Sequence, residues 1–213
     1  FGYDAKVINE TTGEPCQANE KGMLVLAAPL PPGCLATVWR NDERFINGYF
    51  SLLDGKQYAT SDYAVIDEHG YYYILGRTDD VINVAGHRLG TKEIEEAIGH
   101  HPEVAESAVV GIHDELKGEL PIAFCILKNH DLVAETENRF RIEQQIVGEV
   151  ARQLGALAKP AAIYFPKALP KTRSGKILRR SIKALAEGKE TGDMSTLDDP
   201  TAIEAVRQAM ADY

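Results

Sequence analysis

The hydrophobic pattern of the chain changes near Asp79, and this change limits how the chain can fold. Before it, short runs rich in β-branched and aromatic residues alternate with turns, which predicts a β-rich region over residues 1–78. After it, apolar residues recur with both helical and strand periods, which predicts mixed α and β structure. We therefore expect an α+β chain with a domain boundary near Asp79.

The same periods place the individual elements. Strands are expected at residues 5–9, 23–27, 63–67, 71–75, 81–84, 105–112, 122–127 and 161–165. Helices are expected at residues 92–99 with Thr91 as cap, at 139–154, at 177–186, and after Asp199–Pro200. The helix over residues 139–154 should bury one apolar stripe, formed by Phe140, Ile146, Val147, Val150 and Leu154.

One loop gathers positive charge in an otherwise acidic chain. It runs Leu-Pro-Lys-Thr-Arg-Ser-Gly-Lys and ends at Lys176, with a glycine that allows a sharp turn just before the lysine. Its neighbouring cations are Lys171, Arg173, Arg179 and Arg180. Crowded cations repel one another unless an anion binds among them, so the loop is either an anion site or a solvated basic loop. It is not a Walker-type phosphate loop, because the first glycine and the final Ser or Thr are missing.

Composition excludes several classes of function. The net charge of −9 argues against nonspecific binding to nucleic acid or to an anionic membrane surface, and no apolar stretch is long enough to span a bilayer. Cys16, Cys34 and Cys125 are odd in number and widely spaced, so neither a disulfide framework nor a zinc knuckle is expected, and a reducing cytoplasm fits best. The first residues form neither a signal peptide nor a start, which suggests a piece of a longer chain.

A second motif, Gly-Arg-Thr-Asp-Asp-Val-Ile-Asn-Val-Ala-Gly-His-Arg-Leu-Gly, covers residues 76–90 and is followed by Thr-Lys-Glu-Ile-Glu. In this order and at this distance from the lysine loop, the pair resembles the acyl- and aryl-CoA synthetases that work through an acyl-adenylate. Further segments at 29–33, 198–200 and 207–210 are similar to the short-chain branch of that family. The resemblance covers essentially the whole chain.

The resemblance implies a division into three parts. Residues 1–78 would be the C-terminal, β-rich end of a large AMP-binding domain. Residues 79–186 would form a small mobile α/β domain, a short sheet with packed helices that carries the catalytic lysine, and residues 187–213 would be a tail with a terminal helix. The implied substrates are a short acid, propionate or alternatively acetate, with ATP, CoA and Mg²⁺ and no tightly bound prosthetic group.

The resemblance also implies roles in adenylation. Lys176 would bridge the attacking carboxylate and the α-phosphate of ATP. Asp62 would accept hydrogen bonds from the ribose hydroxyls, Arg77 would contact the ribose from the opposite side, and Arg88 would face the phosphates. Asp79 would be the hinge about which the small domain rotates. The family more often has glycine in place of Ser61.

Thioester formation would use a second face after that rotation. Ala85 and Gly86 would line the tunnel for the pantetheine arm of CoA, and Arg152 would contact a CoA phosphate. A magnesium ion would be held, mostly through backbone oxygens, by Gly99, His101 and Val104. A transition-metal site at His100–His101 is not expected, because adjacent side chains at a helix end do not face one ion.

Two further hypotheses concern modification of Lys176 and the activity of the chain by itself. Acetylation of Lys176 by a protein acetyltransferase, reversed by a deacylase, would remove its charge and block adenylation. Alternatively, the chain by itself is a non-catalytic module or a target of that modification, because neither a phosphate-binding glycine-rich loop nor an acyl pocket is present in it. The chain alone should then bind AMP only weakly and show no synthetase activity.

Overall fold

The computed structural model describes residues 2–51, 55–192 and 194–213, and the chain separates into two compact units, Phe1–Asp79 and Asp80–Tyr213. The division falls inside the short 3₁₀ helix η2 (Thr78–Asp80). Within the described parts of the chain, no helix is long and apolar enough to cross a membrane.

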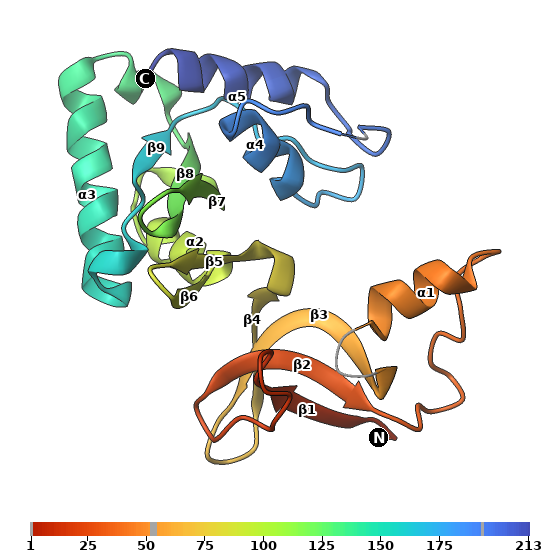
Figure 1. The fold of residues 1–213 in the computed structure, drawn as a ribbon. Helices are drawn as coiled ribbons and strands as arrows, with labels where there is room; N and C mark the ends of the chain where they lie inside the picture. Colours follow the sequence, from red (N-terminus) through yellow and green to blue (C-terminus); the bar gives the residue numbers. More distant parts are fainter. Residues whose placement is uncertain (1, 52–54, 193) are drawn as a thin grey trace. The chain divides into compact units, whose positions relative to one another are not determined.

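The first unit is built on an antiparallel four-stranded sheet in the order β1-β2-β3-β4 (Figure 1). Its strands are β1 (Asp4–Ile8), β2 (Lys21–Ala27), β3 (Gln57–Ile66) and β4 (Tyr72–Arg77), and one helix, α1 (Asp42–Tyr49), precedes β3. Alternate residues of the strands share a face of the sheet, and a small core forms from Ile8, Met23, Val25 and Ala59.

The second unit has a mixed sheet in the order β6-β5-β8-β7, with β9 parallel to β8. Its strands are β5 (Val81–Val84), β6 (His87–Gly90), β7 (Val104–Asp114), β8 (Gly118–Leu127) and β9 (Ala162–Tyr164). Its helices are α2 (Thr91–Gly99), α3 (Thr136–Leu154), α4 (Arg179–Ala186) and α5 (Thr201–Ala211), with short 3₁₀ turns η3 (His130–Val133) and η4 (Ala156–Ala158).

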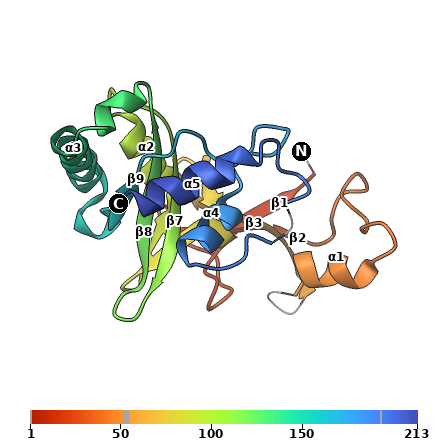
Figure 2. The same cartoon turned by 90° about the horizontal axis from the view of Figure 1, so that it is seen from above.

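Strand β8 supplies both cores of this unit because its side chains alternate between the two faces of the sheet. Ala123 and Cys125 pack with α2 and α3, whereas Ile122 and Phe124 pack with α4 and α5. In both views α3 lies on one side of the β7–β8 pair and α4 and α5 lie on the other (Figures 1 and 2). The α+β fold class expected from the sequence is confirmed.

Some expected details were wrong. In α3 the buried stripe is Ile142, Ile146 and Val150, a strict i, i+4, i+8 series, while Phe140 is 61% exposed. The N-cap of α2 is Gly90 instead of Thr91, which is the first helical residue and is buried. At this cap the Gly90 N–H donates to Glu93 Oε2 over 3.2 Å.

Other elements were not expected or are longer than expected. The sequence reading missed α1 and β6, began α3 three residues late and began α4 two residues early. The region expected as a tail belongs to the second compact unit, because Val206 of α5 is fully buried in the core beside α4. Helix α5 is therefore part of the framework that carries the lysine loop.

Candidate functional site

The segment that carries Lys176 is a small closed turn. The N–H of Thr172 donates to Lys176 O over 2.8 Å, and the N–H of Gly175 donates to Thr172 O over 2.8 Å. The Thr172 hydroxyl oxygen accepts the N–H of Lys176 over 3.1 Å. Gly175 has φ +81°, a conformation that favours glycine, so this residue makes the sharp turn possible.

The ends of this turn are attached to the core of the second unit. The N–H of Leu178 donates to Pro170 O over 2.9 Å, which closes the base of the turn. Leu169, immediately before it, is 4% exposed, and Ile182 in the first turns of α4 is fully buried. The lysine is thus an exposed side chain on a rigid base.

Of the crowded cations near this loop, Lys171 and Arg179 form ion pairs with carboxylates of the protein. Lys171 Nζ lies 2.7 Å from Glu106 Oε2 of β7, and Arg179 Nη2 lies 2.7 Å from Glu95 Oε2 of α2. In the part of the chain that the structure describes, Lys176 is exposed and forms no ion pair. The protein itself therefore supplies the anion for two of the crowded cations, Lys171 and Arg179.

Asp62 and Arg77 come together in the first unit. They are directly opposite across β3 and β4, and Arg77 Nη1 lies 3.7 Å from Asp62 Oδ1. Arg77 Nη1 also donates to Thr60 O over 3.3 Å. The sequence reading expected Arg77 to reach a ribose from the side opposite Asp62, whereas here the two side chains contact each other.

Ser61 stands where the proteins that the motif resembles more often have glycine, and its backbone conformation suits glycine better. Its φ of +62° lies in the left-handed region, which costs a residue with a side chain more than it costs glycine. The adjacent bulge brings the Thr60 hydroxyl to Leu24 O over 2.9 Å, and the same hydroxyl oxygen accepts the Asp62 N–H over 3.1 Å. The bulge thus sets the backbone from which the Asp62 carboxylate projects.

Ala85 and Gly86 form the two-residue turn between β5 and β6. Both have positive φ, +50° and +84°, as a type I′ hairpin requires. The Ala85 N–H donates to Lys117 O over 2.7 Å, which ties the turn to the β7–β8 loop. A side chain at Gly86 would meet no atom within 4 Å, so the turn conformation alone accounts for this glycine.

The remaining candidates for nucleotide and CoA binding lie on separate elements. Arg88 is exposed on β6, two residues beyond that turn, and Asp79 lies in η2 at the division between the units. Arg152 of α3 is 70% exposed, and its Nη2 lies 2.5 Å from Glu149 Oε1. The hydrogen bond from Arg152 lowers the pKa of Glu149 to about 2, so a CoA phosphate would compete with a charged carboxylate for this arginine.

In the loop over residues 99–104, where a magnesium ion was expected, several backbone and side-chain groups already form hydrogen bonds within the protein. The carbonyl of His101 accepts the Val104 N–H over 3.1 Å, and Lys128 Nζ donates to Pro102 O over 2.5 Å, which places an ammonium group in this loop. The His101 ring accepts the Glu103 N–H at Nδ1, so Nε2 carries the proton and donates to Gln145 Oε1 over 3.1 Å. Among the described residues, no cluster of three His, Cys, Asp or Glu side chains could hold a metal. The carbonyls of His101 and Pro102 therefore already accept hydrogen bonds within the protein.

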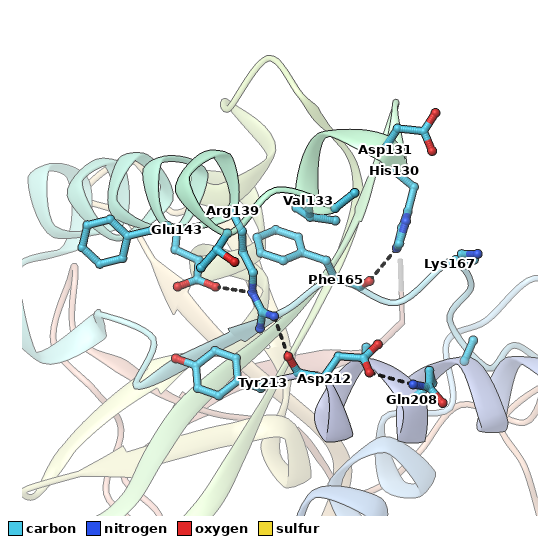
Figure 3. A pocket seen from close by; sticks show the side chains of 15 residues that line it. His130, Asp131, Val133, Arg139, Glu143, Phe165, Lys167, Gln208, Asp212 and Tyr213 are labelled. Carbon is cyan, nitrogen blue, oxygen red and sulfur yellow. Dashed lines mark hydrogen bonds and ion pairs between the residues drawn. The ribbon is translucent and has the colours of Figure 1, made fainter.

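A cavity of about 830 Å³ lies elsewhere in the second unit, between η3, the start of α3, and α5 (Figure 3). None of the site residues expected from the sequence lines it. Its centre is occupied by Arg139, whose Nε lies 3.0 Å from Glu143 Oε1 and whose Nη1 donates to Asp212 O over 2.9 Å. The contact with Asp212 joins α3 to the end of α5.

The sequence reading missed three carboxylates that hold the lysine loop and α4 in place. Glu95 and Glu106 bind Arg179 and Lys171, and Glu119 of β8 lies 2.8 Å from Lys183 of α4. Glu95 and Arg179 are 84 positions apart, so no local pattern could have paired them.

Comparison with known proteins shows which families and structures this chain is similar to. Residues 93–176 match the family model for the AMP-binding enzyme C-terminal domain. The crystal structure of the anthranilate CoA ligase AuaEII in complex with anthranoyl-AMP is similar, with a TM-score of 0.73 and 31% identity over 87% of this chain and 34% of that one. Residues 93–176 thus match this C-terminal domain, and the chain is similar over most of its length to a CoA ligase of known structure.

Individual relatives are similar over nearly the whole chain. The propionate–CoA ligase of Salmonella typhimurium is 53% identical over 99% of this chain and 33% of its own length. The acetyl-coenzyme A synthetase of Pyrobaculum aerophilum is 47% identical over 98% of this chain and 30% of its own length. The chain thus spans about a third of the length of the curated relatives that it matches.

Proposed function

We propose that this chain is the C-terminal part of an AMP-forming short-chain acyl-CoA synthetase that converts propionate, ATP and CoA into propionyl-CoA, AMP and diphosphate. In the first step a propionate oxygen attacks the α-phosphorus of ATP, the bond to the diphosphate oxygen breaks, and propionyl-AMP forms. In the second step the CoA sulfur attacks the acyl carbon, AMP leaves, and the thiol proton passes to solvent.

The observation that carries this proposal is the exposed ammonium group of Lys176 on a closed turn, which forms no ion pair with any residue that the structure describes. The first step brings a carboxylate against a polyphosphate, so its barrier falls mainly through charge neutralisation and positioning. A lysine on a rigid base supplies a point charge on a long stem that can lie between the two anions. Mg²⁺ would enter with ATP and offset further phosphate charge.

Asp62, Arg77 and Arg88 are the residues that we propose for nucleotide binding. The Asp62 carboxylate has two acceptor oxygens that suit the two vicinal ribose hydroxyls, and Arg77 Nη1 lies 3.7 Å from its Oδ1. Arg88 would face the phosphates during adenylation. These roles rest on the match of each residue to the family motif and on the exposure of the side chains.

Thioester formation would follow rotation about Asp79. This rotation would withdraw Lys176 and bring the Ala85–Gly86 turn to the active site, where its backbone would line the pantetheine tunnel. A short 3₁₀ helix at the division between two compact units suits a hinge, since only a few backbone torsions need to change. Arg152 would contact a CoA phosphate after releasing Glu149.

Propionate is preferred over acetate as the acid on the strength of identity alone, 53% against 47% for the relatives compared above. The test is ATP-dependent loss of free CoA thiol by the full-length protein with each acid. We expect kcat/KM for propionate to exceed that for acetate at least tenfold. A reversed ratio would favour acetyl-CoA synthetase, and no turnover with either acid would favour the non-catalytic module.

The chain alone should be inactive in the same assay. Acetylation of Lys176 by a protein acetyltransferase, and its removal by a deacylase, would switch the first step off and on, because the modification removes the positive charge. The expected setting is the cytoplasm, with no nucleic acid or membrane partner.

A further inference from the structure

The carboxylate of Glu95 makes an unusually complete set of contacts at the start of α4. Its Oε1 accepts from Arg179 Nε and Nη2 over 3.1 and 2.8 Å, and its Oε2 accepts from Arg179 Nη2 over 2.7 Å. Its Oε1 also accepts the N–H of Val109 in β7 over 2.9 Å. One carboxylate therefore fixes α2, β7 and α4 to one another.

This pair is better shielded than the ordinary surface ion pair. The side chains of Arg179 and Glu95 are 17% and 12% exposed. A multidentate guanidinium–carboxylate contact at this burial is both stronger and more directional than an exposed one, which often contributes nothing measurable.

Helix α4 needs such a partner for an electrostatic reason. Its first two residues are Arg179 and Arg180, its first turn has no acidic residue, and no side chain caps its N-terminus. Two cations at the positive end of a helix oppose its dipole, which destabilises the first turn. The Glu95 charge offsets this cost at the residue where the helix begins.

The position of that residue links the pair to the proposed chemistry. Only Ile177 and Leu178 separate Arg179 from Lys176, and at the other end of the turn Lys171 binds Glu106 over 2.7 Å. The lysine turn is thus held by one ion pair at each end. Loosening Arg179 would release the first turn of α4 and the closing bond from Leu178 to Pro170 O.

We propose that Glu95 and Arg179 are positioning residues for Lys176, which hold the lysine turn in the geometry that adenylation requires. This inference rests on the proposed function of Lys176. A displacement of about 1 Å of a charge that must lie between two reacting anions costs on the order of 100-fold in rate. The thioester step does not use Lys176, so it should be nearly indifferent to the pair.

The test compares Glu95→Gln and Arg179→Met with Glu143→Gln in the full-length protein. Glutamine at position 95 keeps the shape and an acceptor for Val109 N–H while removing the charge. Glu143 is a matched control, since its pair with Arg139 is similarly buried, at 16% and 20% exposed, and lies on α3 away from the turn. We expect both variants of the Glu95 pair to lower kcat for acyl-AMP formation about 10- to 100-fold, with KM for ATP and the thioester step within about twofold. Glu143→Gln should leave all of these within about twofold.

A second readout does not depend on turnover. Amide hydrogen exchange of Gly175 and Lys176, whose N–H groups bond within the turn, should become at least about tenfold faster in Glu95→Gln and stay unchanged in Glu143→Gln. Equal loss in both half-reactions, or no excess over Glu143→Gln in kcat and exchange, would overturn the positioning role. If the unaltered protein forms no acyl-AMP, the proposed function fails instead, and the exchange comparison alone decides whether the pair holds the turn.

Discussion

Gly111 on β7 is the position at which a single methyl group should disturb the second unit most clearly. A Cβ added there would lie 2.9 Å from Ile82 Cγ2 and 3.2 Å from both Cδ and Oε1 of Glu119. Glu119 is not free to yield, because its Oε1 binds Lys183 Nζ over 2.8 Å and its Oε2 accepts the Asn83 N–H over 2.9 Å. Gly111→Ala therefore forces either a clash in the sheet or the loss of these bonds.

The size of the effect follows from the contacts. Normal separation of two methyl carbons is near 4 Å, so about 1 Å of overlap with Ile82 must be relieved, and overpacking of this kind costs about 1–3 kcal/mol. With about 2 kcal/mol as the central value, and about 3–5 °C of Tm per kcal/mol for a unit of this size, the midpoint of thermal unfolding should fall by about 6–10 °C.

The matched control is Gly148, a glycine at which substitution by alanine should raise the stability of the unit. Gly148 lies in the middle of α3, and a Cβ there would meet no atom within 4 Å. Gly148→Ala should therefore raise stability by about 0.5–1 kcal/mol, or about 2–4 °C in Tm, because glycine weakens a helix interior. Differential scanning calorimetry, with the transition assigned by hydrogen exchange of residues 104–127, measures both changes. A Tm within 2 °C of the unaltered chain for Gly111→Ala, or a fall for Gly148→Ala, would refute the packing argument.

Three further predictions concern individual side chains. Burial raises the pKa of the fully buried Cys125 thiol. A thiol reagent should therefore label Cys16 and Cys34 in the folded chain and Cys125 only after unfolding. Rapid labelling of all three thiols in the folded chain would contradict this prediction. The hydrogen bond from Arg152 lowers the pKa of Glu149 to about 2. The contribution of this carboxylate to stability is therefore present above about pH 4.3 and is lost as the pH falls toward 2. NMR titration should show this pKa, and Glu149→Gln should flatten the dependence of stability on pH in that window only. Asp62→Asn in the full-length protein should weaken AMP binding about 10- to 100-fold by calorimetry, because it removes a charged acceptor from the ribose; unchanged affinity would argue against that role.

The sequence predicted elements well where the hydrophobic period was long and unambiguous. Strand β5 was placed correctly at residues 81–84, and the apolar runs of β7 and β8 were recognised because both strands are buried. The expected stripe of α3 was wrong at Phe140, because this residue lies outside the four-residue series of Ile142, Ile146 and Val150 that faces the core.

What the sequence did not reveal depends on unusual torsions and long-range contacts. The β5–β6 hairpin was missed because alanine at the first turn position is not the Asn-Gly or Asp-Gly signal of a type I′ turn, although Ala85 adopts the required φ of +50°. The motif located the lysine turn, but the carboxylates that hold it come from α2 and β7, far away in sequence. Such contacts are set by the packing of the whole unit.

The central claim is that Lys176 serves adenylation alone, and one comparison of half-reactions tests it most directly. Lys176→Gln in the full-length protein should lower formation of propionyl-AMP from propionate and ATP by at least about 100-fold. Conversion of supplied propionyl-AMP and CoA into propionyl-CoA should stay within about threefold, and Lys167→Gln, which removes another exposed lysine, should change neither step. Equal loss in both half-reactions, or no loss in the first, would contradict the account.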